Sequence, residues 1–138
     1  MRLSWEKYAL NLAVTASWRS EDRYVQVGAC ALGKDNMVLG VGYNGLAPGK
    51  NVADDFWEDR DARRKYMIHA EANCLTLVKR GECSLLAVTM LPCAACASLI
   101  ASYEIPKVVY HNNYGKDEGA LKIFDFYGIE CVNIEIKS

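Results

Sequence analysis

The sequence predicts one α/β domain built on a mixed sheet of about five strands. In its second half, apolar runs rich in β-branched residues alternate with helical stretches, which is typical of parallel strands covered by helices on both faces. In its first half, two neighbouring apolar runs flank a turn-forming tetrapeptide, which is typical of an antiparallel hairpin. With 138 residues, of which 51% are hydrophobic, the chain is long enough to bury a core as a single domain over residues 1–138.

The first half is predicted to begin with a helix and continue as the hairpin. Ser4 is a candidate N-cap for a helix over residues 5–16, where apolar residues recur every three or four positions. The two strands of the hairpin are residues 25–32 and 37–43, and the sequence Gly-Lys-Asp-Asn between them forms the turn.

Residues 44–66 form the longest irregular part of the chain, and we expect one exposed helix in its charged stretch, residues 54–65. A segment of this length in a compact domain is usually functional. The elements expected after it, in chain order, are a helix at 69–79 that ends in two cations and a glycine, a strand at 84–91, a helix that begins at Pro92 and runs to 103, a strand at 107–111, a helix at 118–127 and a strand at 129–136.

Composition and charge exclude several classes of protein. The net charge of −1 without a basic run argues against binding long nucleic acid, whereas a small anionic ligand needs only one or two arginines. The charges of Arg2, Glu6 and Lys7 argue against a signal peptide, and no apolar stretch approaches the roughly 18 residues of a membrane span. We therefore expect a cytoplasmic protein whose six cysteines are thiols or metal ligands rather than disulfides.

Two short motifs carry the residue types of a catalytic zinc site, namely HAE at the start of one predicted helix and PCAAC at the start of another. A catalytic zinc takes three protein ligands and keeps one position for water, and His69, Cys93 and Cys96 are three suitable ligands. Glu71 can reach that water without binding the metal, and can move its proton to a departing amine. This H-x-E…P-C-x-x-C pattern is the signature of zinc nucleobase deaminases.

Each of these residues also has a plainer interpretation. A Cys-x-x-Cys can be a redox dithiol, part of a metal site or two buried thiols, although a redox dithiol usually lacks a matched His-x-Glu. A structural zinc would need a fourth protein ligand, which Glu71 could supply. His111, at the end of a strand, could contact substrate. The remaining cysteines are expected in the core or on neutral surface: Cys30, Cys74, Cys83 and Cys131.

Five motifs follow one another along the chain: QVGA, GYNG, HAEAN, PCAAC and KVVY. In their order and spacing, across residues 17–131, the sequence resembles the deoxycytidylate (dCMP) deaminases of the zinc-dependent cytidine deaminase-like superfamily. The resemblance implies a three-layer α/β/α sandwich with a catalytic Zn²⁺ held between two helix starts. It also implies hydrolytic conversion of dCMP to dUMP and ammonia, with Glu71 protonating N3 of cytosine and then the leaving amine.

The same resemblance implies substrate contacts. The backbone around Ala70 would hold the edge of the pyrimidine, and Asn44, in GYNG, would bind the deoxyribose 3′-hydroxyl. The Asn-Gly pair at this point could also be a simple turn dipeptide. Four further residues match family positions near the phosphate, and each is equally consistent with a solvated surface residue: Arg19, Ser20, Arg23 and Tyr114.

The resemblance extends to regulation and assembly. Members of the family are commonly homohexamers that dCTP with Mg²⁺ activates and dTTP inhibits, and residues 44–66 are where such an effector could bind. The sequence departs from the family pattern at Cys74, usually an alanine, and in the loop NGLAPG, which has one extra residue before Pro48. Because His111 is the only spare histidine, we expect no second, structural zinc.

Three other functions share parts of this pattern. A nucleoside cytidine deaminase needs no phosphate-binding arginine, so similar rates on deoxycytidine and dCMP would favour it. A tRNA adenosine deaminase should have a basic surface, and the net charge of −1 counts against it. A non-catalytic zinc or thiol-redox module belongs to a different class, and metal analysis together with a deamination assay separates it from the enzymes.

Overall fold

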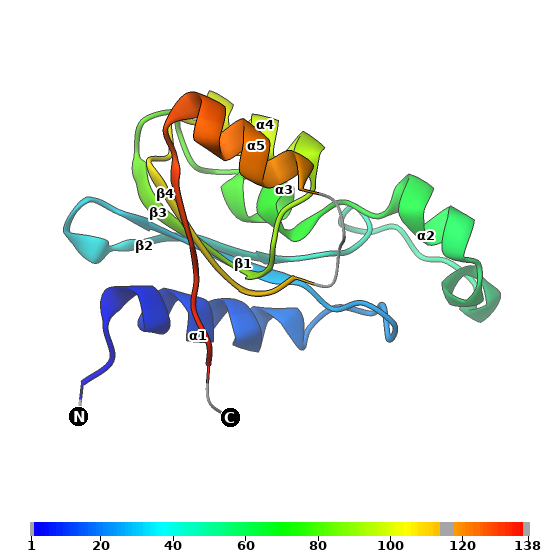
Figure 1. The fold of residues 1–138 in the computed structure, drawn as a ribbon. Coiled ribbons are helices and arrows are strands. Elements are labelled where there is room, and N and C mark those ends of the chain that lie inside the picture. Colours follow the sequence, from blue (N-terminus) through cyan, green and yellow to red (C-terminus); the bar gives the residue numbers. More distant parts are fainter. Residues whose placement is uncertain (1, 114–117, 137–138) are drawn as a thin grey trace.

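The computed structural model describes residues 2–113 and 118–136, and its central feature is a five-stranded sheet with helices on both faces (Figure 1). The strands are β1 (Gly28–Gly33), β2 (Val38–Tyr43), β3 (Cys83–Met90), β4 (Lys107–Asn112) and β5 (Glu130–Asn133). The helices are α1 (Trp5–Ser17), α2 (Arg60–Tyr66), α3 (Ala70–Leu75), α4 (Ala94–Ser102) and α5 (Gly119–Tyr127), with the 3₁₀ helices η1 (Lys34–Asn36) and η2 (Asp54–Glu58). None of the described helices combines the length and apolar character needed to cross a membrane.

The sheet is mixed, as the sequence predicts. Its strand order is β2-β1-β3-β4-β5, with β1 antiparallel to β2 and β3, and β4 parallel to β3 and β5. The predicted hairpin is the β1–β2 pair, and it turns through η1, where Asp35 and Asn36 adopt a positive φ that short polar side chains tolerate. Every residue of β1 is buried, which is typical of a strand covered on both faces.

Each face of the sheet has its own apolar core. Among the described helices, α1 covers one face, where Leu10 and Ala13 pack with Leu32 of β1. Helices α3, α4 and α5 cover the opposite face, where Ile100 and Phe124 are fully buried (Figure 1). The three-layer α/β/α arrangement predicted from the sequence is therefore confirmed. The first helix also begins as predicted, because the Ser4 side chain accepts a hydrogen bond from the Lys7 amide at 3.2 Å.

Helix α3 lies unusually close to strand β2, and two glycines make this possible. A Cβ at Gly42 would stand 2.4 Å from the backbone nitrogen of Cys74, and one at Gly40 would stand 2.4 Å from the Cys74 carbonyl oxygen. Any other residue would push the helix away, since backbone atoms cannot rotate aside. The start of α3 is thereby fixed relative to the sheet.

Strand β1 begins later than the predicted residue 25. The side chain of Asn44 takes up the backbone groups that a strand would use: Oδ1 accepts from the Val27 amide, and Nδ2 donates to the Val25 carbonyl, each at 2.8 Å. Residues 25–27 are thus held as an extended segment beside Asn44, and the sheet ladder starts at Gly28.

The charged stretch at 54–65 forms two short helices instead of the single exposed helix predicted. Asp59 interrupts them with an extended backbone (φ −96°, ψ 103°), and its side chain accepts from the Ala62 amide at 3.2 Å to cap α2. Trp57 in η2 is buried, so the segment is anchored on the protein rather than fully exposed.

Helix α3 is shorter than predicted and ends at Leu75 instead of residue 79. Thr76 Oγ1 donates back to the carbonyl oxygens of Ala72 and Asn73, both at 3.1 Å, and the Val78 amide bonds to Leu75 in a tighter turn. The two cations and the glycine predicted to end this helix therefore lie in the following turn.

The last strand, β5, ends at Asn133 instead of residue 136. Beyond it, the Ile136 amide donates to Nδ1 of His111 at 3.2 Å, so a side chain replaces the backbone partner that a longer strand would need.

Candidate active site

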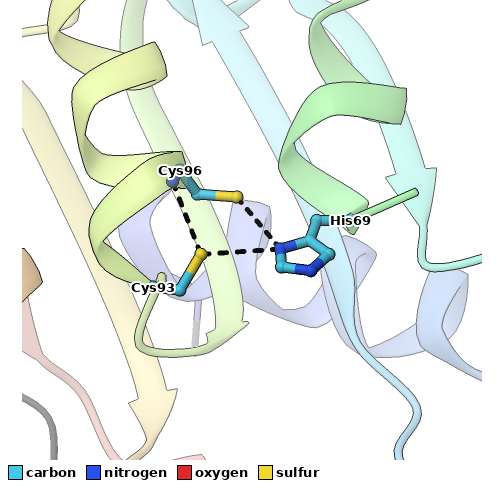
Figure 2. Close-up of side chains that lie close together, drawn as sticks. All are labelled: His69, Cys93 and Cys96. Carbon is cyan, nitrogen blue, oxygen red and sulfur yellow. Dashed lines mark hydrogen bonds between the residues drawn. The ribbon is translucent and has the colours of Figure 1, made fainter. Parts of the chain in front are cut away.

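Three side chains of metal-binding type meet at one end of the sheet: His69, Cys93 and Cys96 (Figure 2). Their ligand atoms all lie within 4.8 Å of one another. His69 Nδ1 is 3.2 Å from Cys96 Sγ and 3.6 Å from Cys93 Sγ. Among the described residues, this is the only group of three or more histidine, cysteine or carboxylate side chains close enough together to hold a metal ion.

The local fold explains why these residues converge. His69 is the N-cap residue of α3 and Cys93 is the N-cap residue of α4, so two helix starts bring them together. Cys93 Sγ accepts from the Cys96 amide at 3.5 Å, in the manner of a capping side chain. Pro92 precedes the cap, rather than standing in the first turn as predicted. The positive end of the α4 dipole therefore lies beside the two sulfur atoms.

The donor set fits a catalytic zinc ion. Two thiols and one imidazole are typical zinc ligands, and three protein ligands leave the fourth position of a tetrahedral site for water. Burial raises the pKa of the Cys96 thiol, and the nearby Glu71 and Cys93 raise it further, so a bound cation would be needed to hold Cys96 as a thiolate. Glu71 does not belong to the ligand group, which disfavours a structural zinc with Glu71 as fourth ligand.

The remaining cysteines lie away from this group. Cys30, Cys74 and Cys83 are buried and Cys131 is partly buried, in agreement with their predicted packing roles. Burial raises the pKa of Cys30 and of Cys83 to about 11, which keeps both thiols protonated.

Glu71 stands in the first turn of α3 with only 4% of its surface exposed. Burial raises the pKa of its carboxyl group, while its own backbone amide, His69 and the Cys96 thiol act in the opposite direction. A buried carboxyl group beside a metal-ligand group is suited to proton transfer, because water does not compete for the proton there.

A cavity of about 390 Å³ opens onto this group, and Glu71 and Ala70 line it beside His69 and Cys93. Asn44 also lines the cavity, with its side chain held by the two backbone bonds of the 25–27 segment. The sequence-predicted metal ligands, the acid/base residue and two of the substrate residues are thus brought together. The apolar part of the wall consists of Val25, Val27, Met67, Met90, Leu91 and Pro92.

Arg19, Ser20 and Arg23, which are predicted from the sequence to lie near the phosphate, do not line this cavity. Ser20 is buried, and its hydroxyl donates to the Asn44 carbonyl at 2.9 Å and accepts from the Asp22 amide at 3.2 Å. Arg19 is exposed, 6.0 Å from the centre of the Tyr43 ring, and does not line the cavity. The predicted Tyr114 lies outside the described residues.

Arg23 and His111 line a second cavity, of about 820 Å³, instead of the first. The Arg23 guanidinium is 3.9 Å from Glu58, and both side chains are more than half exposed. The Nδ1 atom of His111 is occupied by the backbone of the chain segment after β5.

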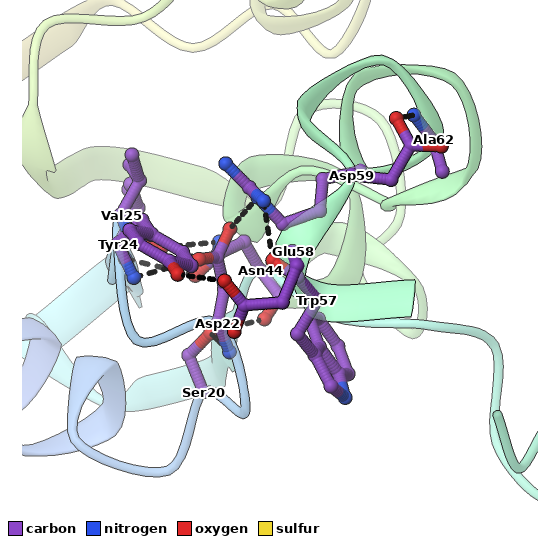
Figure 3. Close-up of polar contacts among 11 residues, drawn as sticks. Ser20, Asp22, Tyr24, Val25, Asn44, Trp57, Glu58, Asp59 and Ala62 are labelled. Atoms are coloured by element: carbon purple, nitrogen blue, oxygen red, sulfur yellow. Dashed lines mark hydrogen bonds and ion pairs between the residues drawn. The ribbon is translucent and has the colours of Figure 1, made fainter. Parts of the chain in front are cut away.

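Sequence reasoning missed the three arginines of α2 that line the first cavity: Arg60, Arg63 and Arg64. Arg63 is held most tightly: its Nε is 3.6 Å from Asp22 Oδ2, and it donates to the Trp57 carbonyl. Its guanidinium also lies 4.5 Å from the centre of the Tyr24 ring. Its partners Asp22 and Trp57 are labelled in Figure 3, together with Tyr24. The signal in the sequence was the RDARRK stretch, a cluster of cations within the long segment after GYNG.

Comparisons with known proteins agree with this geometry. The family model described as "Cytidine and deoxycytidylate deaminase zinc-binding region" matches residues 3–112. The deoxycytidylate deaminase of Pongo abelii is 34% identical over 140 residues, covering 92% of this chain and 78% of that protein. The deoxycytidylate deaminase of Mycobacterium phage D29 is 36% identical over 126 residues, covering 79% of this chain and 95% of that protein.

A solved structure is also similar to this chain over nearly its whole length. A crystal structure of dCMP deaminase from the cyanophage S-TIM5 in complex with dCMP and dUMP aligns with a TM-score of 0.78 at 25% identity, covering 97% of this chain and 99% of that one. With the family model matching most of its length and curated relatives at about one-third identity, this chain belongs to the family of zinc-binding cytidine and deoxycytidylate deaminases.

Proposed function

We propose that this protein is a deoxycytidylate deaminase, which converts dCMP and water to dUMP and ammonia. The observation that carries the proposal is the meeting of His69, Cys93 and Cys96 with the buried Glu71 on one cavity. The names of the relatives and the nucleotides bound in the cyanophage structure favour dCMP over other cytosine compounds.

The residues divide the reaction between them. His69, Cys93 and Cys96 would hold zinc, which supplies the Lewis acid that makes water a nucleophile at neutral pH. Glu71 takes one proton from the attacking water and passes it to N3 of cytosine as the C4–O bond forms. It then takes the second proton from the C4 hydroxyl and gives it to the amine, so that the C4–N bond breaks, the C4 carbonyl of uracil forms and ammonia leaves. Burial of Glu71 at the start of α3 fixes the direction of its carboxyl group and excludes competing water.

Two further residues orient the nucleoside. Ala70 is fully buried at the cavity wall, and the backbone around it contacts the pyrimidine edge. Asn44 binds the deoxyribose 3′-hydroxyl, because each of its polar atoms uses one bond on the backbone and keeps capacity for another. The two backbone bonds hold the Asn44 amide in a fixed orientation, which supports a binding role over the turn dipeptide that the sequence also allowed.

An ammonia-release assay across dCMP, CMP, deoxycytidine and dCTP tests the proposal. We expect dCMP to have the highest kcat/KM, and the purified protein to retain about one zinc ion per chain. Equal rates on dCMP and deoxycytidine would favour a nucleoside deaminase. Deamination of adenosine in tRNA would favour a tRNA adenosine deaminase. Bound zinc without any deamination would show a structural or redox module instead.

Regulation, assembly and location follow from the family resemblance alone. We propose that the whole chain acts as one domain in a cytoplasmic homohexamer, activated by dCTP with Mg²⁺ and inhibited by dTTP. The thiolates that zinc requires at Cys93 and Cys96 suit a reducing compartment. A dCMP saturation curve that neither nucleotide alters would contradict the regulation, and sedimentation velocity would test the hexamer.

A further inference from the structure

We propose that Arg60 and Arg64 of α2 bind the 5′-phosphate of the substrate, and so make the enzyme prefer a nucleotide over a nucleoside. This inference rests on the proposed deamination of dCMP. Both arginines line the same cavity as Glu71 and His69. A nucleotide whose base lies at Glu71 must place its phosphate elsewhere along this cavity, and the lysine and arginine side chains that line its described wall all come from α2.

The third arginine, Arg63, has a different role. Only 13% of the Arg63 side chain is exposed. Its ion-pair partner Asp22 is also buried, with 6% of its side chain exposed. The Nη1 atom of Arg63 donates to the Trp57 carbonyl, and its guanidinium group lies over the Tyr24 ring. Arg63 therefore neutralises Asp22 and fixes α2 against the 20–25 segment, which makes it a positioning residue.

This pairing leaves Arg60 and Arg64 with their charges uncompensated. Within residues 2–113 and 118–136, neither has a carboxylate at ion-pair distance. They stand four positions apart on the helix, so their side chains share one face and can approach one phosphate together. The planar guanidinium group matches phosphate oxygens in pairs, and the apolar cavity wall strengthens that attraction.

The alternative implied by family resemblance places the phosphate near Arg19, Ser20 and Arg23. In this structure the Ser20 hydroxyl is already used by Asn44 and Asp22, and Arg23 faces Glu58 on a different cavity. Our assignment predicts that substitution of Arg60 and Arg64 selectively lowers turnover of dCMP. The family-implied assignment predicts the same loss for substitution of Arg19 and Arg23, so one experiment separates them.

The test compares the double variant Arg60→Gln/Arg64→Gln with the wild type on dCMP and deoxycytidine. We expect kcat/KM for dCMP to fall about 100-fold, which corresponds to two lost charge-assisted hydrogen bonds, while kcat/KM for deoxycytidine changes less than about twofold. The matched control is Lys65→Gln/Arg80→Gln, which removes the same charge from exposed residues outside the cavity and should leave both values unchanged.

Several outcomes would overturn the inference. Equal losses on both substrates would mean that the α2 arginines only support the fold, and an unchanged dCMP value would mean that they do not meet the phosphate. A selective loss in Arg19→Gln/Arg23→Gln would favour the family-implied subsite. Calorimetric binding of dUMP and deoxyuridine gives the same comparison without turnover, so it tests the arginines even if dCMP proves not to be the substrate.

Discussion

The two walls of the cavity are built in different ways. The metal wall, defined by His69, Glu71, Cys93 and Cys96, stands on the starts of α3 and α4, which pack on the central sheet. The arginine wall, defined by Arg60, Arg63 and Arg64, stands on α2, a seven-residue helix without a buried residue, which projects beside the sheet (Figure 1). The first is held by apolar packing. The second is held by polar contacts, above all the Asp22–Arg63 pair, together with the single buried side chain of Trp57 in the preceding η2.

This difference matches what each wall has to do. Proton transfer and metal binding fail when atoms move by fractions of an ångström, so the chemistry lies on elements fixed by the core. Recognition of a flexible phosphate tolerates more movement, and a locally tied segment can change without disturbing the fold. The comparison implies that damage to the metal wall should abolish turnover, whereas damage to the arginine wall should alter substrate preference.

The largest effect is expected for Glu71→Gln, which removes the proposed proton carrier from the metal wall and keeps the shape of the side chain. We expect kcat to fall by about 1,000-fold or more, because glutamine cannot take or give the proton. Zinc content, measured by atomic absorption, should stay near that of the wild type, whereas Cys93→Ser should lose both metal and activity. A Glu71→Gln variant within tenfold of wild-type kcat would show that another group moves the proton.

A smaller effect, on stability, is expected for Gly42→Ala. The new methyl group would stand 2.4 Å from Cys74 N and 2.9 Å from the Ala70 carbonyl oxygen, and these backbone atoms can yield only if α3 shifts. We expect a loss of about 3 kcal/mol in the free energy of unfolding, measured by urea denaturation, and weaker zinc binding. In the same motif, Gly45→Ala meets only the Tyr43 ring at 3.7 Å and serves as the control. Similar losses in both variants would contradict the close approach.

The metal wall could be predicted from the sequence, and the arginine wall could not, for a physical reason. HAE and PCAAC each stand at a helix start, and the α/β pattern places such starts at one end of a sheet. The place of α2 depends instead on contacts between distant segments, such as Asp22 with Arg63, which no periodicity records. The start of strand β1 could not be predicted from periodicity either, because it is set by hydrogen bonds of the distant Asn44 side chain.

The smallest effect is expected for Asp22→Asn, which is also the sharpest test of the difference between the metal wall and the arginine wall. The Oδ1 atom of Asp22 accepts from the amides of Tyr24 at 2.8 Å and Val25 at 3.1 Å, and asparagine can keep both bonds. It cannot keep the ion pair with Arg63, so α2 should become less firmly held. We expect KM for dCMP to rise about tenfold, and kcat on deoxycytidine to stay within about twofold of wild type.

The control for this variant is Glu58→Gln, which makes the same change in the neighbouring pair with Arg23. That pair spans 3.9 Å between side chains that are 57% and 65% exposed, and exposed pairs of this kind contribute little. If Asp22→Asn lowered turnover of deoxycytidine as much as that of dCMP, movement of α2 would be reaching Glu71 and the proposed zinc ligands. The two walls would then act as one unit, and substrate preference could not be altered through α2 without loss of catalysis.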